Sequence, residues 1–285
     1  MTQLLIGADP EFFVEEDGKL VSAYGLIPGT KVAPYPVSCG AVQVDGMALE
    51  ININPASTPE EFVHNIDTVL SELRKMVPDK YSFNFSPVAN FGLDYIYAQP
   101  SDARFLGCNP DYNAYSEMLN RPPQINTPFR TAAGHIHIGW RQASEKDPKQ
   151  HMEKCIILAK QLDFALGVPS LLLDDDNIRR QMYGIAGSFR PKPYGLEYRV
   201  LSNFWLKEKK LKDWVFKTTI IAYNLLFNEG IFIGGKNNRN NAQYYINQAT
   251  NEKLNNLTRG YIRDFLYSNP HLALIVSPVS EYING

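Results

Sequence analysis

Three short segments of the sequence each hold two polar residues that are two positions apart. The pairs are Asp9 with Glu11, His135 with His137, and Glu197 with Arg199. In an extended chain, residues two apart point to the same face, so each segment presents both of its groups together. Neighbouring carboxylates repel each other unless a cation lies beside them, and carboxylate and imidazole groups are ligands of divalent metals. The spacing therefore indicates a divalent metal site built on strands.

Each pair also has an interpretation that needs no metal. Asp9 and Glu11 could lie at a solvated strand edge, and the two histidines could be buried residues with satisfied hydrogen bonds. Glu197 and Arg199 could form an ion pair along one strand. Taken one pair at a time, these alternatives stay open.

Basic residues cluster before the last of these segments. They are Arg179, Arg180 and Arg190, with Lys192 close by, and Arg130 precedes the histidine pair. Guanidinium groups make bidentate contacts with phosphate oxygens, so we expect Arg130, Arg180 and Arg190 to bind a polyphosphate. A solvated helix face is the alternative for Arg179 and Arg180.

Several well-known nucleotide and hydrolase motifs are missing from the sequence. It contains no G-x-x-x-x-G-K-[ST] P-loop, no G-x-G-x-x-G after a strand and no G-x-S-x-G elbow. If ATP binds, we therefore expect it to bind through metal ions and arginines on a sheet rather than through a Gly-rich loop.

The composition limits the classes of partner. The chain has 28 Lys and Arg residues against 30 Asp and Glu residues, a net charge of −2, which argues against nucleic acid or an anionic membrane surface as a partner. With 44% hydrophobic residues it can bury a sizeable core. The three cysteines give no disulfide framework, and the first residues lack the basic start of a signal peptide. We expect a soluble, cytoplasmic protein without a membrane span.

The first part of the chain is rich in strand patterns. Strands are expected at residues 4–7, 11–14, 42–54 and 81–85. Asp17 and Gly18 form a hairpin turn signal, and alternation in residues 42–54 places Asp45 and Glu50 on defined faces. A helix should begin at Pro59, because Thr58 can cap it and Glu61 completes a capping box. The long segment of residues 91–127, which is rich in Pro, Asn, Tyr and Gly, should be a loop region.

The second part mixes helices with two further strands. Strands are expected at residues 131–140 and 195–202, and helices at about 149–166, 170–183, 206–228, 242–254 and 257–267. Gly167 and Pro169 should stop the first of these helices. The order of elements predicts an α+β fold with a mostly antiparallel sheet. We expect one domain, residues 1–285, with a polar helical extension from about residue 206.

Five segments, in this order, together resemble a known family. They are GADPEFF, VDGMALEIN, GCNPDYN, GHIHIG and YGxxGSFRPKPYGLEYR, between about residues 7 and 205. The first, fourth and fifth resemble the E-x-E, His-x-His and Glu-x-Arg strands of glutamine synthetases. The whole pattern is similar to the phage-type carboxylate–amine ligase family, type 2, of the glutamine synthetase/glutamate–cysteine ligase superfamily.

The resemblance implies a fold and a reaction. The fold would be the glutamine synthetase-like catalytic one, a curved sheet with helices on its outer face. The activity would be that of an ATP-dependent carbon–nitrogen ligase, which forms an amide bond through an acyl phosphate with two or more Mg²⁺ or Mn²⁺ ions. A phage origin would place the enzyme in the host cytoplasm.

The resemblance also implies roles for individual residues. Glu11 and Glu50 would bind one ion, with Asp45 as a helper. His135 or His137, together with Glu197 and Asp9, would bind a second ion that bridges the ATP phosphates. Arg199, Arg190 and Glu50 would be catalytic, and Arg199, Arg190 and His137 would face the nucleotide. Asp9 departs from the family pattern, because glutamine synthetases carry Glu at that position.

Two other functions remain possible from the sequence. One is a metal-dependent hydrolase that uses the same carboxylate and histidine site, and the other is a non-catalytic binding protein that keeps the fold. For the ligase, the substrates would be a small-molecule or peptide carboxylate and an amine, and the enzyme could form a homo-oligomer. The candidates for a general base are Glu15, Asp111 and Glu117.

Overall fold

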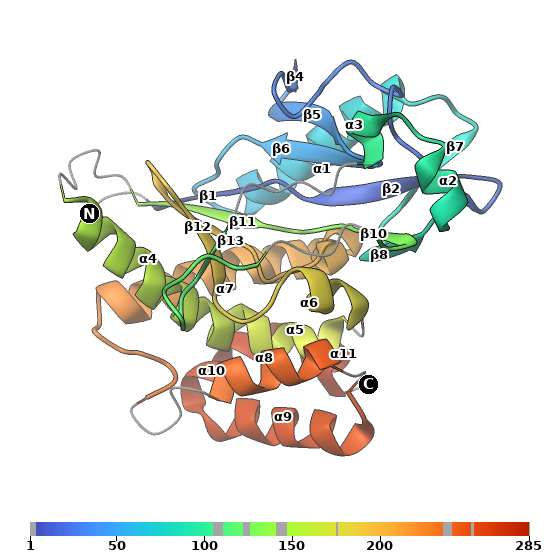
Figure 1. Cartoon of the computed structure of the whole chain (residues 1–285). Helices are drawn as coiled ribbons and strands as arrows, with labels where there is room; N and C mark the ends of the chain where they lie inside the picture. The colour runs from blue at the N-terminus through green and yellow to red at the C-terminus, as the bar shows by residue number, and fades with distance from the viewer. Residues whose placement is uncertain are drawn as a thin grey trace.

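Within the described part of the chain, the strands belong to two main sheets and one small sheet, in which all named strand pairs are antiparallel. This computed structural model describes residues 4–104, 111–121, 126–140, 147–174, 176–235, 241–251 and 254–284. Helices pack on the sheets from both sides (Figure 1), so the expected α+β fold with antiparallel sheet is confirmed.

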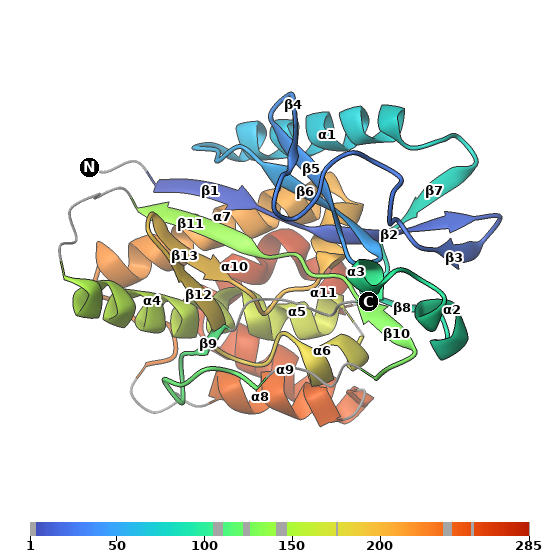
Figure 2. The ribbon, with the colours of Figure 1, turned by 45° about the horizontal axis from the view of Figure 1, so that its top comes forward.

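The first main sheet has five strands. In spatial order they are β1 (Leu4–Ala8), β11 (Ile136–Trp140), β13 (Gly195–Tyr198), β12 (Ser188–Lys192) and β9 (Tyr112–Asn113). Figure 2 shows β1, β11, β13 and β12 side by side. The expected strands at 131–140 and 195–202 are shorter here. Beyond the strand ends, the two segments stay close: Ala133 and Ser202 form an isolated bridge, and a Cβ at Gly134 would lie 2.3 Å from the Ser202 carbonyl oxygen.

The second main sheet holds most of the remaining strands. In spatial order they are β3 (Lys19–Val21), β2 (Glu11–Glu16), β6 (Ala48–Ile53), β5 (Gly40–Asp45) and β4 (Tyr35–Val37), and β7 (Tyr81–Asn84) also pairs with β2. The expected turn between β2 and β3 is confirmed, because Asp17 and Gly18 have φ angles of 50° and 75°. A small sheet pairs β8 (Val88–Asn90) with β10 (Phe129–Thr131).

Helix α1 (Pro59–Met76) covers the second sheet, where it packs on β5 and β6. Its capping is as the sequence predicts: Thr58 Oγ1 accepts a hydrogen bond from the Glu61 amide over 3.1 Å. The Glu61 carboxylate reaches back to the Ser57 amide over 2.7 Å. Residues 91–127 include two short helices, α2 (Leu93–Tyr97) and α3 (Ser101–Arg104), and Cys108 lies outside the described residues.

The other helices form a layer on the opposite side of the strands from β4–β6 (Figure 1). The elements of this layer are α4 (Pro148–Leu162), η1 (Asp163–Gly167), α5 (Val168–Leu173), α6 (Ile178–Met182), η2 (Asn203–Lys207), α7 (Lys209–Phe227), α8 (Asn241–Asn251), α9 (Asn256–Ser268), α10 (Pro270–Val276), η3 (Ser277–Val279) and α11 (Ser280–Asn284). Helix α4 packs on β12 and β13, and α7 packs against both α1 and α4.

The prediction that Gly167 and Pro169 stop a helix is wrong. The chain passes from α4 to α5 through a π-helical turn, η1, in which the Val168 amide donates to the carbonyl of Asp163 five residues earlier. Proline lacks an amide hydrogen, and the first turn of α5 tolerates this absence. The expected helix over residues 170–183 is instead divided into α5 and α6.

This continuous stretch, Pro148–Leu173, is long and apolar enough to cross a membrane by length and composition alone. In the structure, 78% of its most apolar window is buried inside the protein. Such a stretch is weak evidence for a membrane span, because buried core helices have the same length and composition. The sequence does not predict a stretch of this length, because Gly167 and Pro169 interrupt its helical pattern.

The main hydrophobic core runs through the whole chain, from Ile6 to Ile283. Trp214 of α7 is buried and donates from Nε1 to the Ile275 carbonyl oxygen of α10 over 3.0 Å. The helices after residue 206 therefore share one core with the sheets.

Candidate active site

The two main sheets meet where the chain passes from β1 to β2, at Asp9 and Pro10. Here the Glu11 amide donates to the Ala133 carbonyl oxygen over 2.8 Å. The Ile51 amide donates to the Pro10 carbonyl oxygen over 3.1 Å. These bonds fix the end of β1 and the start of β2 against segments from both sheets. Most of the polar residues that the sequence singles out lie around this junction.

Three carboxylates on the second sheet form what we call the acidic cluster: Glu11, Asp45 and Glu50. One oxygen of each lies within 4.8 Å of the others. The β2–β6 register places Glu11 directly opposite Glu50, and Asp45 ends the neighbouring strand β5. Antiparallel residues that lie opposite each other share a face, so the register itself brings the carboxylates together.

The partners of the acidic cluster are few and mostly neutral. The Ala133 amide donates to Glu11 Oε2 over 2.9 Å, and Gln43 Nε2 donates to Glu50 Oε2 over 2.8 Å. Among the residues that the structure describes, Lys31 is in contact with the cluster, and its Nζ lies 2.7 Å from Asp45 Oδ2. Burial and the neighbouring charge of Asp45 raise the pKa of Glu11 to about 7.

The pKa of Glu50 lies well above its ordinary value for similar reasons. Burial is the largest cause, followed by the charges of Asp9 and Glu11. Two carboxyl groups with raised pKa values in one cluster indicate a shortage of positive charge. A divalent cation among these oxygen ligands would supply that charge.

A second group, which we call the histidine cluster, consists of Asp9, His135 and Glu197. Its ligand atoms also lie within 4.8 Å of one another. His135 Nδ1 lies 3.3 Å from Asp9 Oδ1 and 3.6 Å from Glu197 Oε1. His137 adjoins the cluster, with Nε2 3.0 Å from Asp9 Oδ2, and it lies opposite Glu197 in the β11–β13 register.

Cations surround Glu197, which is fully buried. Arg190 Nη1 lies 3.1 Å from Glu197 Oε2, Lys192 Nζ lies 2.7 Å from the same oxygen, and the Arg199 guanidinium contacts Oε1. Burial and the Asp9 charge act to raise the pKa of Glu197, but Arg199 and the two imidazoles hold it at about 2. Glu197 therefore stays ionised and is available as a metal ligand.

The two histidines differ in charge preference. Burial and then the nearby Arg199 lower the pKa of His135 to about 4, which keeps its imidazole neutral, as a metal ligand must be. Burial also acts to lower the pKa of His137, but the Asp9 carboxylate raises it. His135 is thus the better suited of the two to bind a metal ion, and His137 is the better suited to bind an anionic group.

The residues of both clusters fit divalent metal ions. Three carboxylates suit Mg²⁺ or Mn²⁺, and a histidine with two carboxylates suits Mn²⁺ or a similar ion. Asp9 links the two clusters, because its charge acts on both: it helps to raise the pKa of Glu50, and it opposes the cations that hold the pKa of Glu197 low. Two adjacent ions would therefore balance a single buried group of acids.

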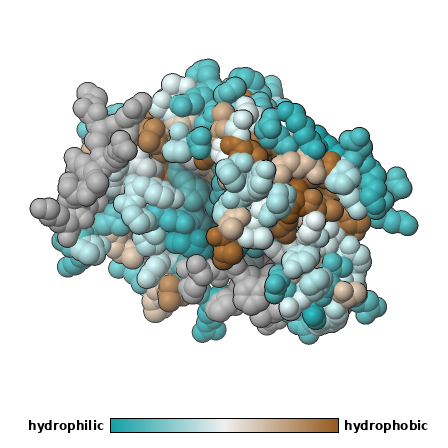
Figure 3. Space-filling view, turned by 90° about the horizontal axis from the view of Figure 1, so that it is seen from above, coloured by the Kyte–Doolittle hydropathy of each residue, from teal (hydrophilic) through white to brown (hydrophobic). Residues whose placement is uncertain are grey.

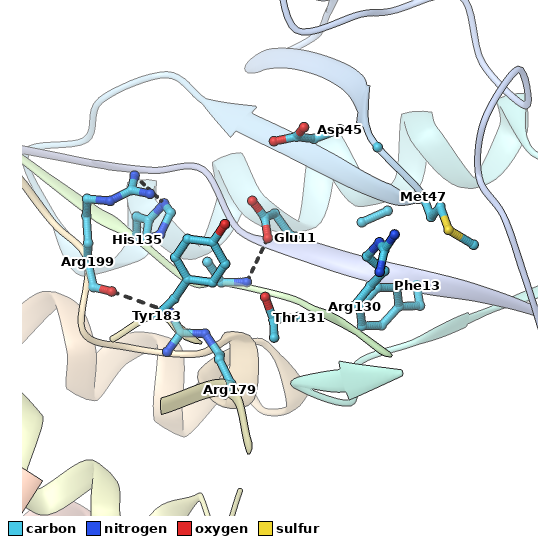
Figure 4. Close-up of a pocket in the computed structure, with 13 residues that line it drawn as sticks. Glu11, Phe13, Asp45, Met47, Arg130, Thr131, His135, Arg179, Tyr183 and Arg199 are labelled. Carbon is cyan, nitrogen blue, oxygen red and sulfur yellow. Dashed lines mark hydrogen bonds between the residues drawn. The ribbon is translucent and has the colours of Figure 1, made fainter. Parts of the chain in front are cut away.

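A cavity lies beside the acidic cluster, and arginines line it (Figure 4). Arg130, Arg179 and Arg199 reach it together with Tyr183 and His135. Arg179 is buried and donates to the Val200 carbonyl oxygen over 2.9 Å. Burial, followed by the charge of Arg180, lowers its pKa to about 10, so it remains a cation at neutral pH. Figure 3 shows a hollow bordered by hydrophilic side chains on the face seen from above.

The structure brings most of the predicted site residues together. The residues at the junction are Asp9, Glu11, Asp45, Glu50, His135, His137, Arg190, Glu197 and Arg199. Arg130 lines the cavity, but its guanidinium donates to the backbone carbonyl groups of Arg104, Thr127 and Phe129. Arg180 is not part of this group, because it faces Asp174, with Nη2 3.6 Å from Oδ2.

The candidates for a general base also differ in position. Asp111 Oδ2 lies 3.3 Å from Arg199 Nε, next to the site. Glu15 instead accepts hydrogen bonds from Ser82 and Asn84, which both lie on β7, and Glu117 is exposed in a turn. Asp111 is therefore the best placed of the three.

Two cations of the site, Arg179 and Lys192, were noted in the basic cluster but were not expected to bind the polyphosphate. Arg179, rather than the adjacent Arg180, reaches the cavity, and the sequence gives no signal that chooses between consecutive residues on a short helix. Lys192 contacts Glu197, and here a signal existed. Arg190 and Lys192 are two apart on β12, the same spacing that marked the other pairs.

Comparisons with known proteins give one family match. A family model described as "Phage phiEco32-like COOH.NH2 ligase-type 2" matches residues 127–271, which include both histidines, Glu197 and Arg199. Among solved structures, a bifunctional glutathione synthetase from Pasteurella multocida is similar at 12% identity and a TM-score of 0.48, over 98% of this chain and 47% of that one. This chain thus spans about half the length of that protein.

A second solved structure, a novel glutamine synthase homologue, is similar at 13% identity and a TM-score of 0.40, over 98% of this chain and 67% of that one. No curated protein matches the chain.

Proposed function

The chain belongs to the phage phiEco32-like COOH.NH2 ligase-type 2 family, and we propose that it is an ATP-dependent carbon–nitrogen ligase that forms an amide through an acyl phosphate. The observation that carries this proposal is the position of the two carboxylate clusters. They adjoin each other at one sheet junction, with Arg190, Lys192 and Arg199 around Glu197. Such an arrangement suits a polyanionic substrate that brings metal ions with it.

Each cluster has a proposed ligand set. Glu11, Glu50 and Asp45 would hold one Mg²⁺ or Mn²⁺ ion. Asp9, Glu197 and His135 would hold a second. When bound, these ions supply positive charge that neutralises the phosphates of ATP.

The proposed reaction has two steps. A carboxylate oxygen of the first substrate attacks the γ-phosphorus, which forms the acyl phosphate and releases ADP. The amine nitrogen then attacks the acyl carbon, inorganic phosphate leaves, and the nitrogen loses a proton. Asp111 is our candidate to accept that proton, because it lies beside Arg199.

The basic residues of the chain would orient these groups. The side chains of Arg190 and Lys192 are 22% and 26% exposed and contact Glu197, so they can also contact phosphate oxygens that approach it. Arg179 and Arg199 line the cavity beside the acidic cluster, where a substrate carboxylate or the acyl phosphate would be held. The substrates would be a small-molecule or peptide carboxylate and an amine, in the cytoplasm of a phage host, and the enzyme could act as a homo-oligomer.

Thermal unfolding with ATP and Mg²⁺ tests the proposal. ATP and Mg²⁺ together should raise the Tm by several degrees, and either one alone should raise it less, because each completes the other's binding site. A protein whose Tm does not respond to millimolar ATP with Mg²⁺ would contradict the proposal.

A substitution assigns the effect to the site. Glu197→Gln should abolish the nucleotide-dependent rise in Tm while the variant remains folded, and Glu117→Gln, an exposed carboxylate in a turn, should keep it. Phosphate release that needs no amine acceptor would indicate a hydrolase instead.

A further inference from the structure

A second cavity, of about 380 Å³, adjoins the histidine cluster. Its lining includes Gly7 of β1, Asn52 and Ile53 of β6, His137 and Gly139 of β11, and Tyr194 of the β12–β13 hairpin. The lining is mainly apolar, and the volume falls within the range of pockets that bind small organic molecules. None of the roles proposed above uses this cavity.

The floor of the cavity is bare β-sheet. The β1–β11 register pairs Gly7 with His137 and Leu5 with Gly139, so both glycines are on the sheet face that carries His137. Neither glycine has a left-handed φ, and a Cβ built on either would meet no atom closer than 3.6 Å. The fold therefore does not require glycine at these positions. Glycine inside a strand commonly marks a place where a ligand approaches the backbone closely.

The walls of the cavity include the aromatic ring of Tyr194 and the side-chain amide of Asn52. The Tyr194 side chain is 46% exposed, its ring centroid lies 6.1 Å from that of His137, and its hydroxyl pairs with His137 Nδ1. Asn52 Nδ2 is buried without a hydrogen-bond partner among the described residues. A buried donor of this kind is costly unless a ligand accepts from it.

The cavity adjoins the hairpin that carries the proposed phosphate-binding residues, because Tyr194 lines it. The β12–β13 hairpin carries Arg190 and Lys192 on one strand and Tyr194 in its turn. His137 contacts Asp9 of the histidine cluster and also lines the cavity. A ligand that places an anionic chain against Lys192 would therefore have its other end beside Tyr194 and the glycine floor.

We propose that this cavity binds the base of ATP, a planar heteroaromatic ring that lies on the Gly7–Gly139 floor beside Tyr194. The Asn52 amide donates to a ring nitrogen of the base. Bare backbone is needed at Gly7 and Gly139 because a side chain there would fill the space of the ring. This inference rests on the proposed ATP-dependent function and adds the residues that recognise the nucleoside.

Calorimetric titration of the full-length protein with two probes tests the inference. The probes are ATP and inorganic tripolyphosphate, each with Mg²⁺, and they differ only in the adenosine. Gly139→Val should weaken ATP binding roughly tenfold or more, because filling a packed space is costly, and should leave tripolyphosphate binding unchanged. Gly7→Ala should have the same selective effect and serves if the valine variant does not fold. Gly260→Ala on α9, where a Cβ meets no atom within 4 Å, is the matched control and should bind both probes as the wild type does.

Two results would overturn the inference and are distinguishable from failure of the proposed function. If ATP binds the folded Gly139→Val and Gly7→Ala variants as tightly as the wild type, the base lies elsewhere, although the ligase proposal stands. If the variants bind ATP and tripolyphosphate with equally reduced affinity, the inference about the base is also wrong, and the ligase proposal again stands. If the wild type binds neither probe, the proposed function fails together with the inference.

Discussion

At the scale of single residues, the acidic cluster controls how the metal-free protein responds to pH. The pKa of Glu11 is raised from 4.5 to about 7, first by burial and then by Asp45. The folded protein therefore binds this proton more tightly than the unfolded chain does. The stability that Glu11 contributes is present below pH 4.5 and is lost as the pH rises towards 7.

A substitution isolates this contribution. In metal-free buffer, raising the pH from 4.5 to 7 should lower the free energy of unfolding of the wild type relative to that of Glu11→Gln. The relative loss should be at most about 3 kcal/mol. Urea denaturation at a series of pH values measures it. Glu15→Gln, on the same strand but outside the cluster, is the control. A difference that does not change with pH would show that Glu11 is not confined among other carboxylates.

The spacing of residues predicted much of the site at this scale. The pairs at Asp9, His135 and Glu197 are all at the junction, because residues two apart on a strand share a face whichever sheet the strand joins. The choice between Arg179 and Arg180 could not be predicted. Consecutive helical residues point in different directions, and the packing of α6 decides which of them reaches the cavity.

At the scale of elements, the π-helical turn η1 lies beneath the strand that carries the site residues. Asp163 of this turn is fully buried and accepts a hydrogen bond of 2.8 Å from the Tyr198 hydroxyl. Tyr198 stands between Glu197 and Arg199 on the opposite face of the strand. The bond therefore ties the helix layer to the position of both site residues.

Removing the hydroxyl tests the importance of this bond. Tyr198→Phe leaves the Asp163 carboxylate without this donor and should lower the free energy of unfolding by about 1–3 kcal/mol at pH 8. Burial raises the pKa of Asp163 to about 7, so the loss should be smaller at pH 6, where the group is protonated. Urea denaturation at both pH values measures the difference, with the exposed Tyr261→Phe as control. An equal loss of free energy of unfolding at pH 6 and pH 8 would mean that the charge of the Asp163 carboxylate does not strengthen the hydrogen bond.

The elements were predicted best where local signals agreed. Thr58, Pro59 and Glu61 gave the start of α1 because capping depends on adjacent residues. The signals at Gly167 and Pro169 failed because a π-turn lets the chain continue through both. Glycine at position 167 also leaves room for its neighbours, since a Cβ would lie 2.7 Å from Ile246 Cδ1 and 2.9 Å from the Tyr198 hydroxyl.

At the scale of the whole molecule, one core supports the junction of the two sheets. Sequence patterns gave the α+β class and the antiparallel pairing, but not the division into separate sheets. That division depends on the crossing at Asp9 and Pro10, where long-range bonds to Ala133 and Ile51 hold the chain. Contacts between such distant segments leave no pattern in either segment alone.

The C-terminal helices should be needed for stability, because they share this core. Leu266 of α9 is fully buried, whereas Leu257 on the same helix is 66% exposed. Leu266→Ala should lower the free energy of unfolding by about 2–5 kcal/mol, and Leu257→Ala by about 0.5 kcal/mol or less. Chemical denaturation of both variants makes the comparison. Similar small losses would show that α9 folds apart from the core.

We propose that two adjacent metal sites bind ATP at the junction of the sheets. Anomalous scattering from crystals grown with Mn²⁺ and a non-hydrolysable ATP analogue tests this claim most directly. We expect one manganese ion among Glu11, Asp45 and Glu50, a second among the residues of the histidine cluster, and phosphate oxygens against Arg190 and Lys192. A nucleotide bound elsewhere, or clusters without manganese, would contradict the account.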